Sequence, residues 1–265
     1  MIETTNYSRK SKITKLLTRA PLRFLQSEES EESAVVYLIR HPGSFTQDGG
    51  SMSVNVGEST TLYLKSQKPL KVFRPRKEMQ NPECLVAHVG DNALFLALMD
   101  PVICYKSSVF EQERKVFLEN DSSSLCMIDW FASGQKIGQG DIWQQERIST
   151  RNSVFLYGSL LVSDSLDMQS SDSTISSKLG AFTVIGSLIL VGTRTVDSQI
   201  QVLKYCQKNT DEVVEGGVAP TDFFMSASAI NGGIVCRFAA YSTEIVYSML
   251  GMLLGINSLS SHSTL

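Results

Sequence analysis

Histidine and cysteine supply most tight metal sites and many catalytic bases and nucleophiles, and both are sparse in this sequence. The chain has three histidines and five cysteines among its 265 residues. They are His41, His88, His262, Cys84, Cys104, Cys126, Cys206 and Cys236. None of them belongs to a C-x2-C, H-x3-H or H-E-x-x-H motif. The spacing therefore predicts no tight metal site.

Motifs for nucleotide binding and for nucleophilic catalysis are missing as well. Gly134, Gly138 and Gly140 follow a predicted strand, but their spacing fits neither the G-x4-G-K-[ST] loop nor the G-x-G-x-x-G loop that cradles phosphates. The sequence has no G-x-S-x-G motif, and His41 and His88 fit structural positions better than that of a general base. We therefore predict that the chain is not an enzyme and binds no nucleotide.

The composition narrows the classes of protein further. The chain carries 24 Lys and Arg against 27 Asp and Glu, and its net charge of −3 gives no basic field for nucleic acid. No run reaches the roughly 18 to 20 apolar residues of a membrane span. The odd number of scattered cysteines is typical of buried thiols in a reducing compartment. We therefore expect a cytoplasmic protein without nucleic-acid or membrane partners.

Apolar and polar residues alternate along most of residues 13–191, which is the period of β-strands. We predict one hairpin around Gly57-Glu58 and another around Gly158-Ser159, with Gly158 at the first central position of a type II′ turn. Near the C-terminus, Ala229–Ala239 is predicted to be a single strand. The chain should therefore be rich in short strands.

Two helices are predicted in the last third of the chain. Val196, Ile200 and Leu203 recur at i, i+4 and i+7, as in a short amphipathic helix. The segment Ser242–Leu254 has an N-cap at its start and Gly255 as a C-cap after its end. Both patterns predict helices near the C-terminus.

These patterns together predict a mainly β fold, a β-rich α+β protein with two helices near the C-terminus. We expect a flexible N-terminus at residues 1–12, a single β-rich domain over residues 13–256, and a disordered tail at residues 257–265. The tail is rich in serine and has little to bury. No internal repeat with a clear period is visible.

The segment DWFASGQKIGQGDIW, residues 129–143, carries a family resemblance. It is similar to the D-W-x-x-S-G-R-x-x-x-R-G-E-x-W motif of the urease accessory protein UreD family, called UreH in some bacteria. The residues on motif positions are Asp129, Trp130, Ser133, Gly134, Gly140 and Trp143. Gln135 and Gln139 stand where the family has arginine, and Asp141 where it has glutamate. These two arginine positions leave the transfer of partner contacts open.

Other segments resemble the same family in the same order along residues 20–255. MDPVICY, residues 99–105, resembles P-[DE]-P-x-I-P-F, and residues 65–73 resemble T-T-Q-x-x-T-K-[IV]-Y. Residues 37–48 are similar to the glycine-rich opening of the family. The residues retained in these segments and on the recurrent arginine of a late strand are Asp48, Gln67, Lys71, Asp100, Pro101 and Arg237. Five motifs in order are more specific than any one of them.

The resemblance implies a scaffold with a spiralling, multi-strand β body. It implies UreF-like and UreG-like accessory proteins and the urease apoenzyme as partners, with GTP on the partner GTPase. It further implies a role in delivering nickel to the urease active site. The chain itself would bind no cofactor tightly and would meet Ni(II) only transiently.

The scarcity of histidine fits a protein that helps nickel pass without retaining it. Thiolate and imidazole cages bind late first-row divalent ions tightly, whereas carboxylates hold them weakly and exchange them. We hypothesise that some of Asp48, Asp129 and Asp141 line or gate an internal nickel route. The alternative is that these residues cap turns and satisfy backbone N–H groups.

A second class of function also fits composition and periodicity. A β-rich binding module unrelated to urease, such as a sandwich or barrel with an interior cavity, would show the same alternation. Loss of urease activity after deletion of the gene separates the two. The first reading requires this loss, and the second does not.

Overall fold

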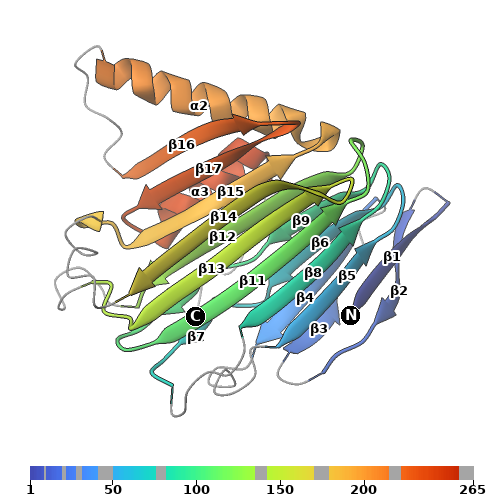
Figure 1. The fold of residues 1–265 in the computed structure, drawn as a ribbon, viewed down its shortest axis with the longest axis horizontal. Helices are drawn as coiled ribbons and strands as arrows, with labels where there is room; N and C mark the ends of the chain where they lie inside the picture. Colours follow the sequence, from blue (N-terminus) through green and yellow to red (C-terminus); the bar gives the residue numbers. More distant parts are fainter. Residues whose placement is uncertain are drawn as a thin grey trace.

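The computed structural model describes residues 1–8, 10–19, 22–27, 32–40, 50–75, 82–134, 142–169, 179–214 and 222–256, with backbone alone for 209–214. It is 59% strand and 14% helix, with both helices in the C-terminal part of the chain, so the predicted mainly β class is confirmed. Two sheets face each other, and the helices pack on the outer side of one of them (Figure 1). The molecule is thus built in layers.

We call the seven-stranded sheet sheet A. Its strands in spatial order are β14 (Ser159–Gln169), β13 (Arg147–Leu156), β11 (Val109–Leu118), β8 (Glu83–Val89), β5 (Ser51–Val56), β1 (Ile2–Tyr7) and β2 (Lys10–Leu16). The five strands from β13 to β1 are parallel, and an antiparallel strand closes each edge.

We call the ten-stranded sheet sheet B. Its main path is β16 (Phe223–Ile230), β17 (Gly233–Ala240), β15 (Val184–Val191), β12 (Ser124–Ser133), β9 (Leu94–Leu98), β6 (Thr61–Ser66), β4 (Ala34–Arg40) and β3 (Leu22–Gln26). The short strands β7 (Leu70–Val72) and β10 (Val102–Cys104) join it beside β12.

The chain spirals between the two sheets. It passes from β5 to β6, from β8 to β9 and from β11 to β12, crossing from sheet A to sheet B each time. Each strand then pairs in parallel with the equivalent strand of the next coil. The spiralling β body implied by the family resemblance is therefore confirmed.

This spiral contradicts the hairpin predicted around Gly57-Glu58, because β5 and β6 lie in different sheets. The predicted alternation is present in both strands, but their inward residues, such as Val54 and Leu62, are fully buried in the core between the two sheets. A Cβ at Gly57 would lie 2.4 Å from the Thr4 carbonyl oxygen, so the chain can cross between the sheets here only with glycine.

Much of the segment predicted to be flexible, residues 1–12, lies in the strands β1 and β2. Strand β1 pairs with β5 on one side and with β2 on the other. Ile2 is fully buried in the core between the sheets, and the Thr4 hydroxyl lies 3.0 Å from that of Thr60. The described basic side chains of this segment are exposed, and its two strands extend sheet A.

Two antiparallel hairpins differ in detail from the prediction. The β13–β14 hairpin is confirmed, but its central residues are Tyr157 and Gly158 with φ of 52° and 75°, so the turn is type I′ and not type II′. The predicted strand Ala229–Ala239 is wrong, because it contains the turn between β16 and β17. Gly232 in that turn has φ of 69°.

Both predicted helices are present. Helix α3 (Thr243–Leu254) has its N-cap at Ser242, whose hydroxyl accepts from the Ile245 N–H at 3.4 Å, and its left-handed C-cap at Gly255. Helix α2 (Val196–Val214) follows a short 3-10 turn, η1 (Thr193–Thr195), and is longer than predicted. Neither of them, in the described part of the chain, combines the length and the hydropathy that spanning a bilayer requires.

The apolar stripe predicted for α2 faces solvent. Val196, Ile200 and Leu203 are 43%, 44% and 40% exposed, whereas Val202 on another side of the helix is fully buried. Tyr205 donates to the Phe223 carbonyl at 3.4 Å, which fixes α2 along the edge strand β16. The sequence pattern indicated the helix correctly but not the face that it buries.

Three apolar clusters form the core. The largest fills the space between the sheets, and the second lies between sheet B and the two helices. The third surrounds β7, β10 and Trp143 at one end of the sandwich. The first and third clusters occupy the same interlayer space but are separate, and polar side chains lie between them.

Replacing Ile2 with alanine tests whether the N-terminal strand is part of the folded core. We expect Ile2→Ala to lower the free energy of unfolding by about 2–4 kcal/mol, because it leaves a cavity at a fully buried site. Thr5→Ala, on the exposed face of the same strand, should change it by less than about 0.5 kcal/mol. Urea denaturation measures both, and equal stability of the two variants would contradict the strand's role.

Candidate functional site: a buried polar belt between the sheets

Seven polar side chains, each no more than 8% exposed, cross the interior of the sandwich. We call them the polar belt: Arg40, Glu83, Gln112, Arg114, Asp129, Asn152 and Asp164. They come from strands of both sheets and lie between two apolar clusters. Buried charges of this density are unusual in a β-sandwich, where alternate inward residues are normally apolar.

The strands place the belt by their alternation. On β11, Gln112 and Arg114 occupy the inward positions between Phe110 and Val116, which belong to different apolar clusters. Asp129 on β12 stands in the same way between Met127 and Phe131. On both strands the inward polar residues thus lie between the same two apolar clusters. The polar residues of the two facing sheets therefore meet in one layer.

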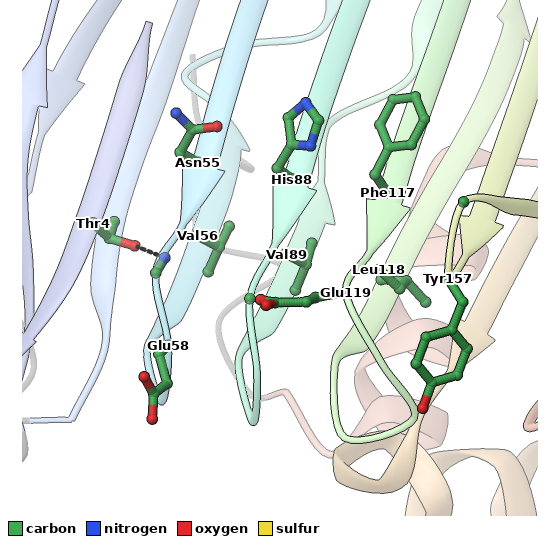
Figure 2. A pocket seen from close by; sticks show the side chains of 13 residues that line it. Thr4, Asn55, Val56, Glu58, His88, Val89, Phe117, Leu118, Glu119 and Tyr157 are labelled. Atoms are coloured by element: carbon green, nitrogen blue, oxygen red, sulfur yellow. Dashed lines mark hydrogen bonds between the residues drawn. The ribbon is translucent and has the colours of Figure 1, made fainter.

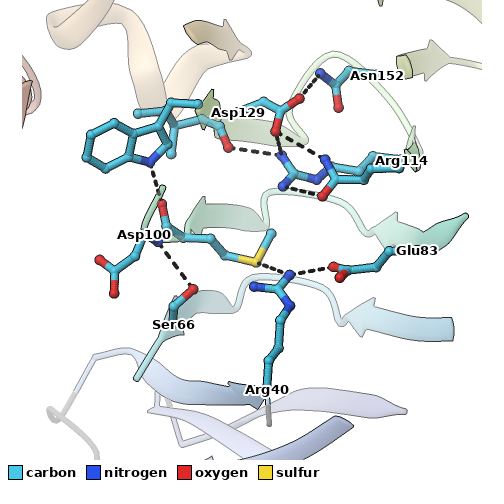
Figure 3. Close-up of polar contacts among 11 residues, drawn as sticks. Arg40, Ser66, Glu83, Asp100, Arg114, Asp129 and Asn152 are labelled. Atoms are coloured by element: carbon cyan, nitrogen blue, oxygen red, sulfur yellow. Dashed lines mark hydrogen bonds and ion pairs between the residues drawn. The ribbon is translucent and has the colours of Figure 1, made fainter. Parts of the chain in front are cut away.

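Asp129 is the centre of the belt (Figure 3). Its Oδ1 accepts from Gln112 Nε2 at 3.1 Å and lies 3.2 Å from Arg114 Nη1, while its Oδ2 accepts from Asn152 Nδ2 at 3.0 Å. Arg114 also donates to the Ile128 carbonyl at 3.0 Å. A carboxylate of sheet B is thus held by three side chains of sheet A.

Two further ion pairs join the sheets on either side of this centre. Arg40 of sheet B pairs with Glu83 of sheet A, and Arg237 of sheet B pairs with Asp164 of sheet A. Arg237 also donates to the Ser165 carbonyl at 3.1 Å and is 54% exposed, so the belt reaches the surface there. Three inter-sheet ion pairs therefore lie in one layer.

Burial is the main influence on the pKa of Arg114. It lowers the pKa of the guanidinium, while the carboxylates of Asp129 and Glu83 raise it. The ordinary arginine pKa is so high that the guanidinium stays charged at neutral pH. Arg114 and Asp129 therefore form a neutral pair of opposite charges within the core.

The belt retains unused hydrogen-bonding capacity. In the described part of the chain, Arg40 Nε, Glu83 Oε2 and Asn152 Oδ1 are buried without a hydrogen-bond partner. Both polar atoms of the Gln145 side chain are in the same state. Buried polar atoms are normally satisfied by protein or by water, so each of these atoms can still form a hydrogen bond.

The residues matched to the aromatic and acidic motif positions support the layer next to the belt. Trp130 Nε1 donates to the Met99 carbonyl at 2.7 Å, and its ring meets that of Tyr247 edge to face at 5.0 Å. Tyr247 in turn donates to Asp100 Oδ1 at 2.8 Å. Burial and the Asp100 charge raise the Tyr247 pKa far above its ordinary value. These contacts fix α3 on sheet B.

The glycine and serine of the motif position the chain around Trp143. The Ser133 hydroxyl accepts from the Trp143 N–H at 3.2 Å, and Trp143 Nε1 donates to the Phe182 carbonyl at 2.7 Å. A Cβ at Gly134 would lie 2.7 Å from the Tyr105 ring, so glycine is required there. The motif therefore specifies local packing.

The remaining matched residues lie at the edges of this region. The Pro101 carbonyl accepts from the Leu70 N–H at 3.2 Å, and the Gln67 N–H donates to the Leu38 carbonyl at 3.0 Å. Lys71 is exposed on β7. Three predicted residues fall outside the described residues: Asp48, Gly140 and Asp141. Of the three predicted nickel-route carboxylates, the structure thus places one, Asp129, in the belt.

The thiols offer no ready metal site. Among the described residues, no three His, Cys, Asp or Glu side chains converge so that they could hold a metal ion. Burial raises the pKa of Cys104, Cys126 and Cys236 to about 12, so these thiols stay protonated at neutral pH. Among the described residues, the buried charged side chains are those of the belt.

Sequence comparisons bear directly on this architecture. The family model described as UreD urease accessory protein matches residues 2–261. The chain belongs to the UreD urease accessory protein family. The resemblance inferred from the motifs is therefore confirmed.

Relatives from plants and bacteria match over nearly the whole UreD chain. Urease accessory protein D of Oryza sativa subsp. indica is 26% identical over 265 residues, which cover 91% of this chain and 86% of the relative. That of Arabidopsis thaliana is 24% identical, with 91% and 90% covered. Urease accessory protein UreD of Sorangium cellulosum is 26% identical, with 93% and 76% covered.

Sequence reasoning found Asp129 but missed most of the belt of this UreD family member. Arg40, Glu83 and Arg114 were not singled out, although each occupies an inward position of a strand. The available signal for these residues was a charged side chain at a strand position where the alternation predicts an apolar, inward-facing one. Its partner could not be identified, because pairs such as Arg40 and Glu83 join different sheets.

Removing the charge of Asp129 should destabilise the protein strongly. We expect Asp129→Asn to lower the free energy of unfolding by about 3–5 kcal/mol, because Arg114 then lies buried without a counter-charge. Arg147→Met removes the half-exposed pairs with Glu111 and Asp167, and should lower it far less, because water screens these charges. Urea denaturation compares the variants, and a loss below about 1 kcal/mol for Asp129→Asn would contradict the assigned pairing.

Proposed function

We propose that this chain is a urease maturation scaffold that bridges apo-urease and a UreF-like and UreG-like accessory complex. It assists delivery and insertion of nickel into the urease active site and catalyses no reaction of its own. The observation that carries the proposal is the UreD family match over residues 2–261. GTP belongs to the partner GTPase, nickel meets this chain only transiently, and the cytoplasm is the expected location.

The second part of the proposal assigns the polar belt to an internal nickel route. The belt is supported as a route by its polar atoms without partners and by its reach from Arg40 to the exposed Arg237. A buried ion pair is often no more stabilising than apolar residues of the same volume. Three such pairs in one layer are therefore difficult to explain by stability alone.

Within this route we propose that Asp129 and Arg114 form a gate. Both carboxylate oxygens of Asp129 are engaged by donors, and the Arg114 guanidinium beside them repels a divalent cation. Nickel can meet the carboxylate only when Arg114 moves away. Carboxylate oxygens then bind Ni(II) weakly and release it again, which suits transfer.

The other two predicted carboxylates of the route stay predictions. Asp48 and Asp141 precede β5 and β13 in the sequence, outside the described residues. We propose that they too take part in the nickel route.

Deletion of the gene tests the scaffold role. In a host with the matching urease and accessory genes, we expect the deletion to abolish urease activity and growth on urea as nitrogen source, because the apoenzyme receives no nickel. Immunoblotting should show normal amounts of urease polypeptide, and metal analysis of the purified enzyme should show that nickel is missing.

The complemented strain is the control for this deletion. Full urease activity without the gene would contradict the scaffold role and would favour the alternative of a β-rich binding module unrelated to urease. Restoration of both activity and nickel content by the wild-type gene excludes a second-site effect.

A further inference from the structure

The outer face of sheet A carries no helix in the described part of the chain. Figure 1 shows both helices on the strands of sheet B, with the strands of sheet A open on their other side. The central strands of sheet A are parallel, and parallel sheets are normally covered on both faces. This face is therefore a candidate for a partner surface.

A row of stacked rings crosses this face. His88 on β8 stacks on Phe117 of β11 at 4.9 Å between ring centroids, and Phe117 stacks on Phe155 of β13 at 4.8 Å. The three residues are direct neighbours in the parallel register, and Leu160 of β14 continues the row at 57% exposure. Stacking across strands stabilises the sheet, but it also creates an exposed apolar ridge.

A groove of about 490 Å³ lies between this ridge and the turns that follow the strands. Figure 2 shows the rings of His88 and Phe117 on one side, and Glu58, Glu119 and Tyr157 on the turns beyond them. Glu58 and Glu119 are the two charged residues that line it, apart from the titratable His88. The walls of the groove are thus aromatic and its rim is acidic.

The charges of the rim are not neutralised within the described residues. Neither Glu58 nor Glu119 forms an ion pair there, whereas Lys115, two residues before Phe117, pairs with Glu113 at 3.1 Å. Tyr157 is 63% exposed, and its hydroxyl donates to Asp121 at 3.1 Å, which adds a further acid to the same end. A ligand that complements this groove is therefore cationic.

We propose that the groove binds an arginine or lysine side chain presented by an extended segment of a partner protein. The rings of His88 and Phe117 line the groove beside Val56, Val89 and Leu118, and this apolar surface suits the aliphatic stem of the side chain. The cationic head then reaches the two carboxylates at the rim. Among the described residues, no three acids, histidines or cysteines converge here as metal ligands.

The groove and the polar belt are separate features. The belt lies between the sheets, and the groove lies on the outer face of sheet A and its strand ends. The inference depends on charge and shape, not on the identity of the partner or on nickel. It stands or fails independently of the proposed function.

The test uses the full-length chain with isotope-labelled histidine, in which His88→Gln assigns the His88 signal. N-acetyl-arginine methylamide is titrated to about 20 mM, a range suited to weak single-residue binding. N-acetyl-citrulline methylamide, which has the same shape without the charge, is the matched ligand control. We expect the His88 signal to shift saturably with the arginine probe and at least tenfold less strongly with citrulline.

Two variants separate the groove from general surface charge. Glu58→Gln with Glu119→Gln should weaken binding of the arginine probe about tenfold, as expected for lost charge-assisted contacts. Asp222→Asn removes an exposed acid that lies outside the groove, directly before the edge strand β16 of sheet B, and should leave binding unchanged. Equal shifts with citrulline, or unchanged binding in the double variant, would overturn the proposal.

The same spectra address two other outcomes. If a second copy of the chain fills the groove, the His88 signal depends on protein concentration and sedimentation shows a dimer, which contradicts the proposed occupant. If the His88 signal does not move up to 20 mM arginine probe while the protein is folded, the groove has no affinity for the side chain and the proposal is wrong.

Discussion

The contact between Arg114 and Asp129 links the two sheets in the middle of the sandwich. The chain crosses from sheet A to sheet B between β5 and β6, between β8 and β9, and between β11 and β12, so strands that follow each other in the sequence lie in opposite layers there. Ion pairs that cross the interior therefore join parts of several coils at once. The apolar clusters on either side exclude water and make these pairs sensitive to any loss of a partner.

The interior between the two sheets is therefore not entirely apolar. Apolar residues would fill the same layer at no loss of stability, yet Gln112, Arg114 and Asn152 all point into it. The layer keeps polar atoms without partners and ends at the exposed Arg237. We propose this layer as the nickel route of this UreD family member.

The β-rich class, both helices and the family could be predicted from the sequence, because they depend on local periodicity, caps and an ordered set of motifs. The crossing of β5 to β6 could not, since a hairpin and a strand pair that faces across a core have the same alternation. The stripe of Val196, Ile200 and Leu203 indicated a helix, but tertiary contacts decided that Val202 is buried. Asp129 was found from its motif, whereas Arg114 became visible only as its partner in the opposite sheet.

We propose that the polar belt serves urease activation and not only stability. The double variant Arg114→Met, Asp129→Asn separates the two roles, because it removes both buried charges and leaves an acceptor for Asn152. Its urease activation is measured in the reconstituted accessory complex, beside its free energy of unfolding. We predict that it regains most of the stability lost by Asp129→Asn alone and yet fails to activate urease. Wild-type activation by this stable double variant would contradict the account.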